Sequence, residues 1–134
     1  MNTYYINDQN FINSEIYQNF LNNNPQRGTL SIRAYAANEA VPIEGVNISI
    51  SSNIDDNKII FYEGTTDSSG TITGIVLPAS TLNLDNLSAP NKTEYNIQAV
   101  YKNIARNYKI NMYENVSVIQ NISIVPEMGD ISGS

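Results

Sequence analysis

Thr66-Asp67-Ser68-Ser69-Gly70 is the stretch of this sequence that says most about the fold. An Asp at the first position of a four-residue turn and a Gly at the fourth are typical of a type I turn, which reverses the chain. The residues on either side, 59–62 and 71–77, are rich in the β-branched and aromatic types that strands favour. We therefore expect a turn between two strands, with Asp67 and Gly70 as its structural residues.

The two-residue alternation of apolar and polar side chains extends over most of the chain from Gly28 onward. Such alternation is typical of strands with one face in a core. The alternating apolar sets are Leu30, Ile32 and Ala34; Val46, Ile48 and Ile50; Tyr95, Ile97, Ala99 and Tyr101; Tyr108, Ile110 and Met112; Val116 and Val118; Ile122 and Ile124.

Turn residues separate these runs. Pro42 and Gly45 follow the first run, Asp55-Asp56-Asn57 separates the second run from the strand at 59–62, and Pro78 is expected to end the strand that begins at Thr71. About seven strands, each of about five to eight residues and separated by turns, predict an all-β sandwich rather than an alternating α/β fold.

The residues before the first strand show the periodicity of a helix. Four apolar side chains fall on one face of the predicted helix: Ile16, Tyr17, Phe20 and Leu21. Asn13 or Ser14 can cap its start, and Asn24-Pro25 should end it, so we predict a helix over 14–22. Two interpretations remain open: a short element that packs against the edge of the domain or serves as a linker, or a docking helix that lays these side chains in a partner's groove.

A chain of 134 residues is long enough for one domain with its own core. We divide it into an N-terminal extension with a short helix (1–27), a β-sandwich domain (28–126) and a flexible tail (127–134). The tail is expected to be flexible because glycine and serine are frequent in it.

Composition argues against several functional classes. Cysteine and histidine are absent, so thiolate zinc sites, thiol nucleophiles and imidazole-dependent triads have no residues to form them. The net charge of -6, with 7 scattered Lys and Arg residues, argues against a nucleic-acid partner. Asp55, Asp56 and Asp67 could suggest calcium, but we interpret them as solvated turn carboxylates. We therefore predict no enzyme activity, no cofactor and no metal.

The sequence shows neither an apolar run long enough to span a bilayer nor the features of a secretory signal at its start. We expect no membrane insertion. The cytoplasm is the default location, and a spore or cell-envelope location is the alternative.

Two groups of residues are candidates for a binding surface. One is a cluster of tyrosines in the later strands, which could stack on sugars or anchor a protein interface: Tyr95, Tyr101, Tyr108 and Tyr113. The other is the long polar loop 80–91, which is interrupted by Leu82, Leu84 and Leu87. The competing interpretations are half-buried sheet tyrosines and leucines that cap the end of the sandwich.

Four segments, 28–32, 41–48, 64–70 and 75–78, together resemble the carboxypeptidase-regulatory-like domain. That family is close in fold to transthyretin and to the B-type (Cna-B-like) repeats of Gram-positive surface proteins. The resemblance covers roughly Gly28 to Pro126 and implies a seven-stranded Ig-like or transthyretin-like sandwich, here with a short N-terminal helix. Family members usually accompany catalytic or surface domains as spacers, folding aids or binding modules.

A narrower likeness involves Tyr17-Gln18-Asn19-Phe20-Leu21 and the segment 120–126, which are similar to the non-catalytic front modules of bacterial spore cortex-lytic proteins. The frequent Asn, Ile and Tyr residues, which use AT-rich codons, suggest a low-GC bacterium or its phage. We predict a non-catalytic structural or protein-interaction module, cell-envelope or spore associated, that binds a protein partner or associates with itself by edge pairing. A carbohydrate- or peptidoglycan-binding module is the alternative.

Overall fold

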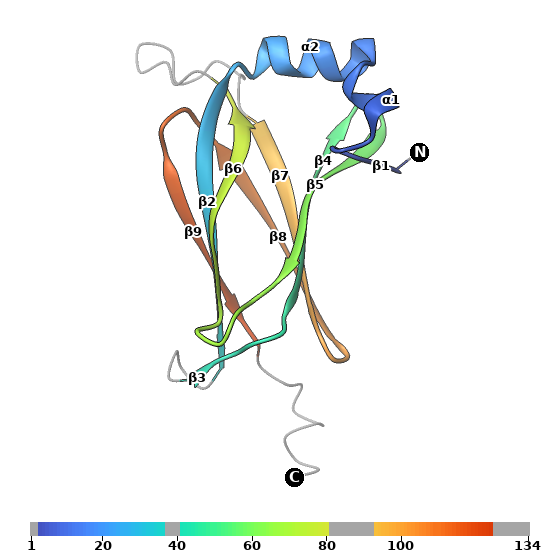
Figure 1. The fold of residues 1–134 in the computed structure, drawn as a ribbon. Helices are drawn as coiled ribbons and strands as arrows, with labels where there is room; N and C mark the ends of the chain where they lie inside the picture. The colour runs from blue at the N-terminus through green and yellow to red at the C-terminus, as the bar shows by residue number, and fades with distance from the viewer. Residues whose placement is uncertain (1–2, 37–40, 81–92, 125–134) are drawn as a thin grey trace.

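The chain folds into two β-sheets packed face to face, with two short helices across one end (Figure 1). This computed structural model describes residues 3–36, 41–80 and 93–124. The five-stranded sheet has the order β1-β5-β4-β7-β8. Its strands are β1 (Thr3–Tyr5), β4 (Asn47–Ile54), β5 (Asn57–Thr65), β7 (Thr93–Tyr101) and β8 (Ile104–Met112).

The second sheet is built around β2 (Gln26–Ala36), which pairs with three other strands. They are β3 (Val41–Pro42), β6 (Thr71–Ala79) and β9 (Ser117–Ser123). β3 and β6 run antiparallel to β2, whereas β9 runs parallel to it. The fold is therefore the β-sandwich that the alternation predicts.

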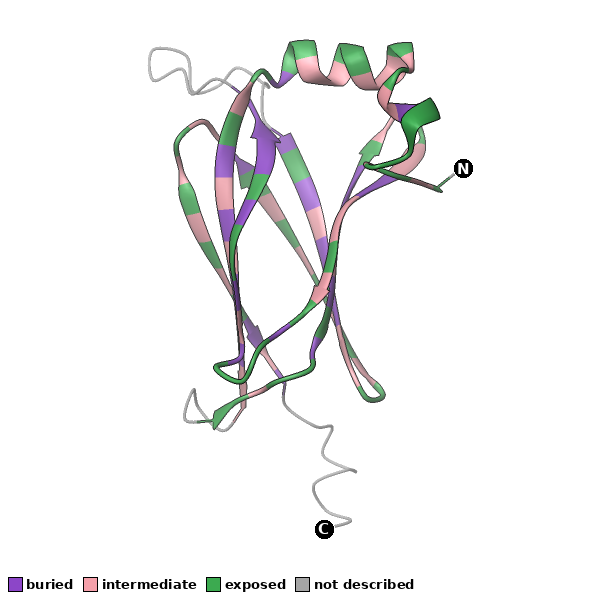
Figure 2. Ribbon diagram, in the orientation of Figure 1, coloured by how far each residue is buried: buried purple, intermediate pink, exposed green. Residues whose placement is uncertain are grey.

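The core lies between the sheets, where the predicted apolar positions meet. Figure 2 shows buried and more exposed residues alternating along β2 and β7, as expected for strands with one inward face. Leu30 and Ile32 of β2 and Ile97 of β7 are all buried. The same core cluster takes Val46, Ile48 and Ile50 from β4 and its preceding turn, and Ile75 and Leu77 from β6.

The turn at Asp67 is confirmed. The Gly70 N–H donates to the Asp67 carbonyl at 2.8 Å, and Asp67 Oδ1 accepts from the N–H groups of Ser69 and Thr71 at 2.9 and 3.0 Å. These hydrogen bonds lower the pKa of the Asp67 carboxyl, the one from the Thr71 N–H having the largest effect. Gly70 takes φ +74°, and its carbonyl accepts from the Ala34 N–H at 2.7 Å, which joins the turn to β2.

Two helices precede β2: α1 (Gln9–Ile12) and α2 (Glu15–Asn23). The predicted helix 14–22 is thus found one residue later, with Ser14 as the N-cap that accepts from the Tyr17 N–H. α2 crosses one end of the sandwich between α1 and the start of β2 (Figure 1). The Phe20 ring lies 5.7 Å from the Phe61 ring, centroid to centroid, so α2 packs against the edge of its own domain.

Nine strands are present among the described residues, rather than about seven. The two that the sequence did not indicate are short. β3 pairs only through Tyr35 and Ala36 of β2. β1 is a three-residue strand parallel to β5, formed by residues that the sequence assigns to an extension. Such short pairings leave too little alternation to recognise. The domain boundaries at 27/28 and 126/127 stay predictions.

The predicted end of a strand at Pro78 is wrong. β6 continues to Ala79, and Pro78 itself pairs with Arg27 of β2. Because β6 pairs with β2 alone among the described strands, a residue without an N–H can be accommodated there. Pro42 similarly lies in β3, and Gly45 takes φ +85° in the turn before β4.

Some predictions concern residues outside the described part of the chain. These residues are Leu82, Leu84, Leu87 and the tail 127–134. Of the predicted loop 80–91 only Ser80 is described, and it is buried and bridges to Tyr113. Within the described ranges, neither helix is long and apolar enough to cross a bilayer.

Candidate binding surfaces

The four predicted tyrosines do not form one exposed surface. Tyr95 is fully buried, and its hydroxyl donates to the Pro78 carbonyl at 2.6 Å. Burial raises the pKa of that hydroxyl. Tyr101 and Tyr108 are half-buried and pack against the core, and Tyr113 is half-buried just beyond the end of β8. A platform that includes Tyr95 is therefore wrong, because the alternation places its ring between the sheets.

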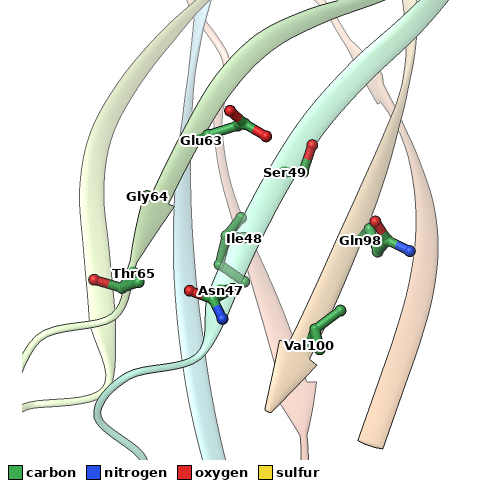
Figure 3. A pocket seen from close by; sticks show the side chains of 8 residues that line it. All are labelled: Asn47, Ile48, Ser49, Glu63, Gly64, Thr65, Gln98 and Val100. Atoms are coloured by element: carbon green, nitrogen blue, oxygen red, sulfur yellow. The ribbon is translucent and has the colours of Figure 1, made fainter. Parts of the chain in front are cut away.

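A shallow groove lies instead on the outer face of the five-stranded sheet (Figure 3). It has a volume of about 450 Å³ and crosses β5, β4 and β7. Its lining residues are Asn47, Ile48, Ser49, Glu63, Gly64, Thr65, Gln98 and Val100. Half of these residues carry amide or hydroxyl groups, because many outward positions of these strands are polar in the sequence.

The groove offers hydrogen bonds but no pair of groups suited to catalysis. Ser49 is paired in register with Glu63 of β5 and Gln98 of β7, but the sequence has no histidine to activate its hydroxyl, and Glu63 is the only carboxylate in the lining. Among residues 3–36, 41–80 and 93–124, no three acidic, His or Cys side chains are grouped to hold a metal ion. The arrangement can bind a polar ligand.

A second candidate surface is the free edge of β8. All nine residues of β8 pair with β7 without a register shift, and no described strand pairs with its other side. Lys102 and Asn103 form a two-residue hairpin turn, so Tyr101 and Ile104 are a hydrogen-bonded pair. From this pair onward, alternate residues turn their backbone N–H and C=O groups away from β7. These residues are Ala105, Asn107, Lys109 and Asn111.

The inward side chains of β8 are only partly covered. Ile104, Tyr108 and Ile110 pack against the core yet stay half-buried, because nothing described lies beyond this edge. The edge therefore combines unpaired backbone groups with incompletely buried apolar surface, the two features that favour strand addition.

Comparison with known proteins gives a likeness of fold. No family model and no curated protein matches the chain. Among solved structures, it is similar to sea bream transthyretin in complex with thyroxine, with 13% identity, a TM-score of 0.49, and coverage of 73% of this chain and 87% of that one. For transthyretin from Sparus aurata the identity is 12% and the TM-score 0.44, with 71% and 90% covered.

The chain is also similar to 5-hydroxyisourate hydrolase from Klebsiella pneumoniae, with 15% identity and a TM-score of 0.42 over 72% of this chain and 87% of that one. These structural neighbours have the transthyretin-like sandwich that the sequence resemblance implies. At these identities the likeness concerns the fold alone.

Sequence reasoning identified the alternation at Tyr108, Ile110 and Met112, but neither the start of β8 at Ile104 nor its position at the edge of a sheet. Strand order depends on pairings between distant residues, and the alternation in β8 looks the same as that in the central β7. A weak signal does exist: the outward positions of β8 include Lys109, and lysine is typical of edge strands.

Proposed function

We propose that this protein is a non-catalytic structural module that associates with a second copy of itself through the edge of β8. The observation that carries the proposal is the free edge of β8, nine residues long, regular in register and only partly covered on its inner face. An added strand would satisfy the outward backbone groups and bury the apolar side chains at the same time.

A second copy is the occupant because β8 is complementary to itself. Antiparallel pairing centred on Tyr108 places Asn107 opposite Lys109 of the other copy. On the inner face it places Ile104 opposite Met112, and Arg106 opposite Ile110. No two charges of the same sign lie directly opposite in this register, and each contact occurs twice, as a two-fold interface requires.

The outward N–H of Asn107 gives a specific test. Replacing Asn107 by proline removes this donor while leaving the hydrogen bonds to β7, because Asn107 turns its backbone groups outward. Asn107→Ala removes the same side chain but keeps the N–H, and so is the matched control. Pairing through a single strand buries less surface than the about 1,200 Å² of a stable interface, so association should be reversible and concentration-dependent.

Light scattering coupled to size exclusion, over a range of loading concentrations, should show the mass rising towards twice 14.9 kDa for the unmodified protein and for Asn107→Ala. Asn107→Pro should remain a monomer and keep the far-UV circular dichroism of a folded sandwich. A strict monomer in all three samples, or association that the proline leaves unchanged, contradicts the proposal.

The finer prediction from the sequence, a cell-envelope or spore module of a low-GC bacterium or its phage, is part of this proposal. It is supported by the residue composition and by the resemblance to non-catalytic front modules. Genes next to this one that encode a lytic hydrolase, sporulation proteins or phage tail proteins would each select one of these settings. Genes of intermediary metabolism alone would contradict all three.

A further inference from the structure

A notch lies between β4 and β7 at the end of the sandwich that α2 covers. The two strands pair from Asn47–Val100 as far as Ser51–Asn96 and then separate. The gap has a volume of about 220 Å³. It is lined by Phe20, Asn24, Ser52, Asn53, Thr93, Glu94 and Asn96.

The floor of the notch is held in place by buried hydrogen bonds. The Thr93 hydroxyl donates to Asn24 Oδ1, and both residues are buried. Asn24 Nδ2 in turn donates to the Phe20 carbonyl at 2.9 Å, which joins the end of α2 to the start of β7. The Ser52 hydroxyl spans the gap between the strands and donates to the Glu94 carbonyl at 2.8 Å. These bonds organise the site before any ligand arrives.

The rim, in contrast, is not engaged. Asn53 and Glu94 are exposed and Asn96 is half-buried, and none of these three side chains makes a hydrogen bond with another described residue. Together they offer two amides, which donate and accept, and one carboxylate, which accepts. The Phe20 ring, half-buried, forms the apolar wall beside them.

This combination of groups indicates the class of ligand. A sugar ring presents hydroxyls that both donate and accept, and one face of C–H groups that can pack against an aromatic ring. A hard cation prefers several oxygen ligands with more than one carboxylate, and the lining has only Glu94. An anion would be repelled by that same carboxylate. The notch, with a volume of about 220 Å³, is smaller than pockets for drug-sized ligands, which measure about 300–1,000 Å³. It therefore has room for a single sugar ring.

We propose that the notch between β4 and β7 is a binding site for one neutral sugar ring, with Phe20 as the packing surface and Asn53, Glu94 and Asn96 as hydrogen-bonding groups. This site is separate from the free edge of β8, and sugar binding there does not depend on association of the protein with a second copy. It places glycan recognition on an amide-rich notch instead of on the tyrosines predicted from the sequence.

The test is an NMR titration of the ¹⁵N-labelled full chain with maltotriose, cellotriose and N-acetylchitotriose in separate experiments. At least one sugar should shift the amide signals of residues 53 and 94–96 in a saturable way, with a Kd of about 1 mM or lower. No saturable shift with any of the three, or shifts confined to other parts of the chain, would overturn the proposal.

Variants then locate the site. Asn96→Ala removes a rim amide from an outer-face position and should weaken binding about tenfold, roughly the effect of one hydrogen bond. Phe20→Leu should weaken it by a similar factor, because it keeps an apolar side chain without the ring. Gln98→Ala is the matched control: it lies on the same face of β7, two residues from Asn96, and lines the groove of Figure 3 instead of the notch.

The unliganded spectrum of each variant must keep the dispersion of the folded protein. Binding that survives Asn96→Ala unchanged, or that Gln98→Ala weakens as much, would place the sugar elsewhere and overturn the assignment.

Discussion

Two glycines with almost the same backbone conformation allow the packing of the Asp67–Gly70 turn to be measured. Gly70 has φ +74° and Gly74 has φ +73°. A Cβ at Gly70 would lie 2.5 Å from the Ala34 carbonyl oxygen and 3.0 Å from the Ile43 nitrogen, whereas a Cβ at Gly74 would have nothing within 4 Å. The difference in unfolding free energy between Gly70→Ala and Gly74→Ala therefore measures the contact of the turn with β2 and with the chain after β3.

Gly74→Ala should cost about 1 kcal/mol of unfolding free energy, since only the left-handed backbone is strained. Gly70→Ala carries the same strain plus the overpacking of two backbone atoms, which adds about 1–3 kcal/mol. Because the 2.5 Å approach is to a backbone carbonyl that cannot move aside, we expect Gly70→Ala to lower the free energy of unfolding by about 3 kcal/mol in total. For a chain of this length that lowers the midpoint of thermal unfolding by about 10 °C.

Urea unfolding followed by far-UV circular dichroism measures both variants on the same scale. Equal m-values would show that the two transitions expose similar surface. Equal losses of stability in Gly70→Ala and Gly74→Ala would refute the reasoning, because the turn would then not pack on Ala34 and Ile43 as described.

Two further predictions concern pH. Burial raises the pKa of the Tyr95 hydroxyl. The contribution of Tyr95 to stability is therefore fully present below the unfolded-state pKa of about 10 and is lost as the pH rises further. The urea midpoint should be lower at about pH 11 than at about pH 8, and Tyr95→Phe should reduce that difference. A fall in the urea midpoint that is equally large in Tyr95→Phe would show that other groups cause it. Hydrogen bonds lower the pKa of Asp67, so its contribution is present above the unfolded-state pKa of about 3.9 and is lost as the pH falls through the lower folded value. Asp67→Ala should therefore lower the melting temperature at neutral pH and have less effect in acid, and an equal effect at both would contradict the turn hydrogen bonds.

The fold was largely predictable because its determinants are local. Alternation places Leu30, Ile32 and Ile97 inside, and the turn residues Asp67 and Gly70 adopt the conformations that their chemistry favours. Short strands such as β1 and the continuation of β6 through Pro78 were not predictable, since both depend on which neighbour the strand pairs with.

The candidate sites were less predictable than the fold. Tyr95 has the side chain of a binding residue, but its position in the alternation directs it into the core, and that information was present in the sequence. The notch joins Phe20 of α2 to Asn53 and Asn96 from two strands that separate. No local pattern indicates such a meeting, because it depends on where β4 and β7 stop pairing.

The most direct test of the central claim uses the absence of cysteine from the sequence. In the proposed two-fold pairing of β8, residue 108 faces its own copy in a non-hydrogen-bonded pair with Cα atoms about 4.5 Å apart, a distance suited to a disulfide. Residue 111 would lie about 20 Å from its counterpart. Under mild oxidation, Tyr108→Cys should form a covalent dimer at protein concentrations where Asn111→Cys does not. Equal cross-linking of both variants, or none in either, would contradict association through β8.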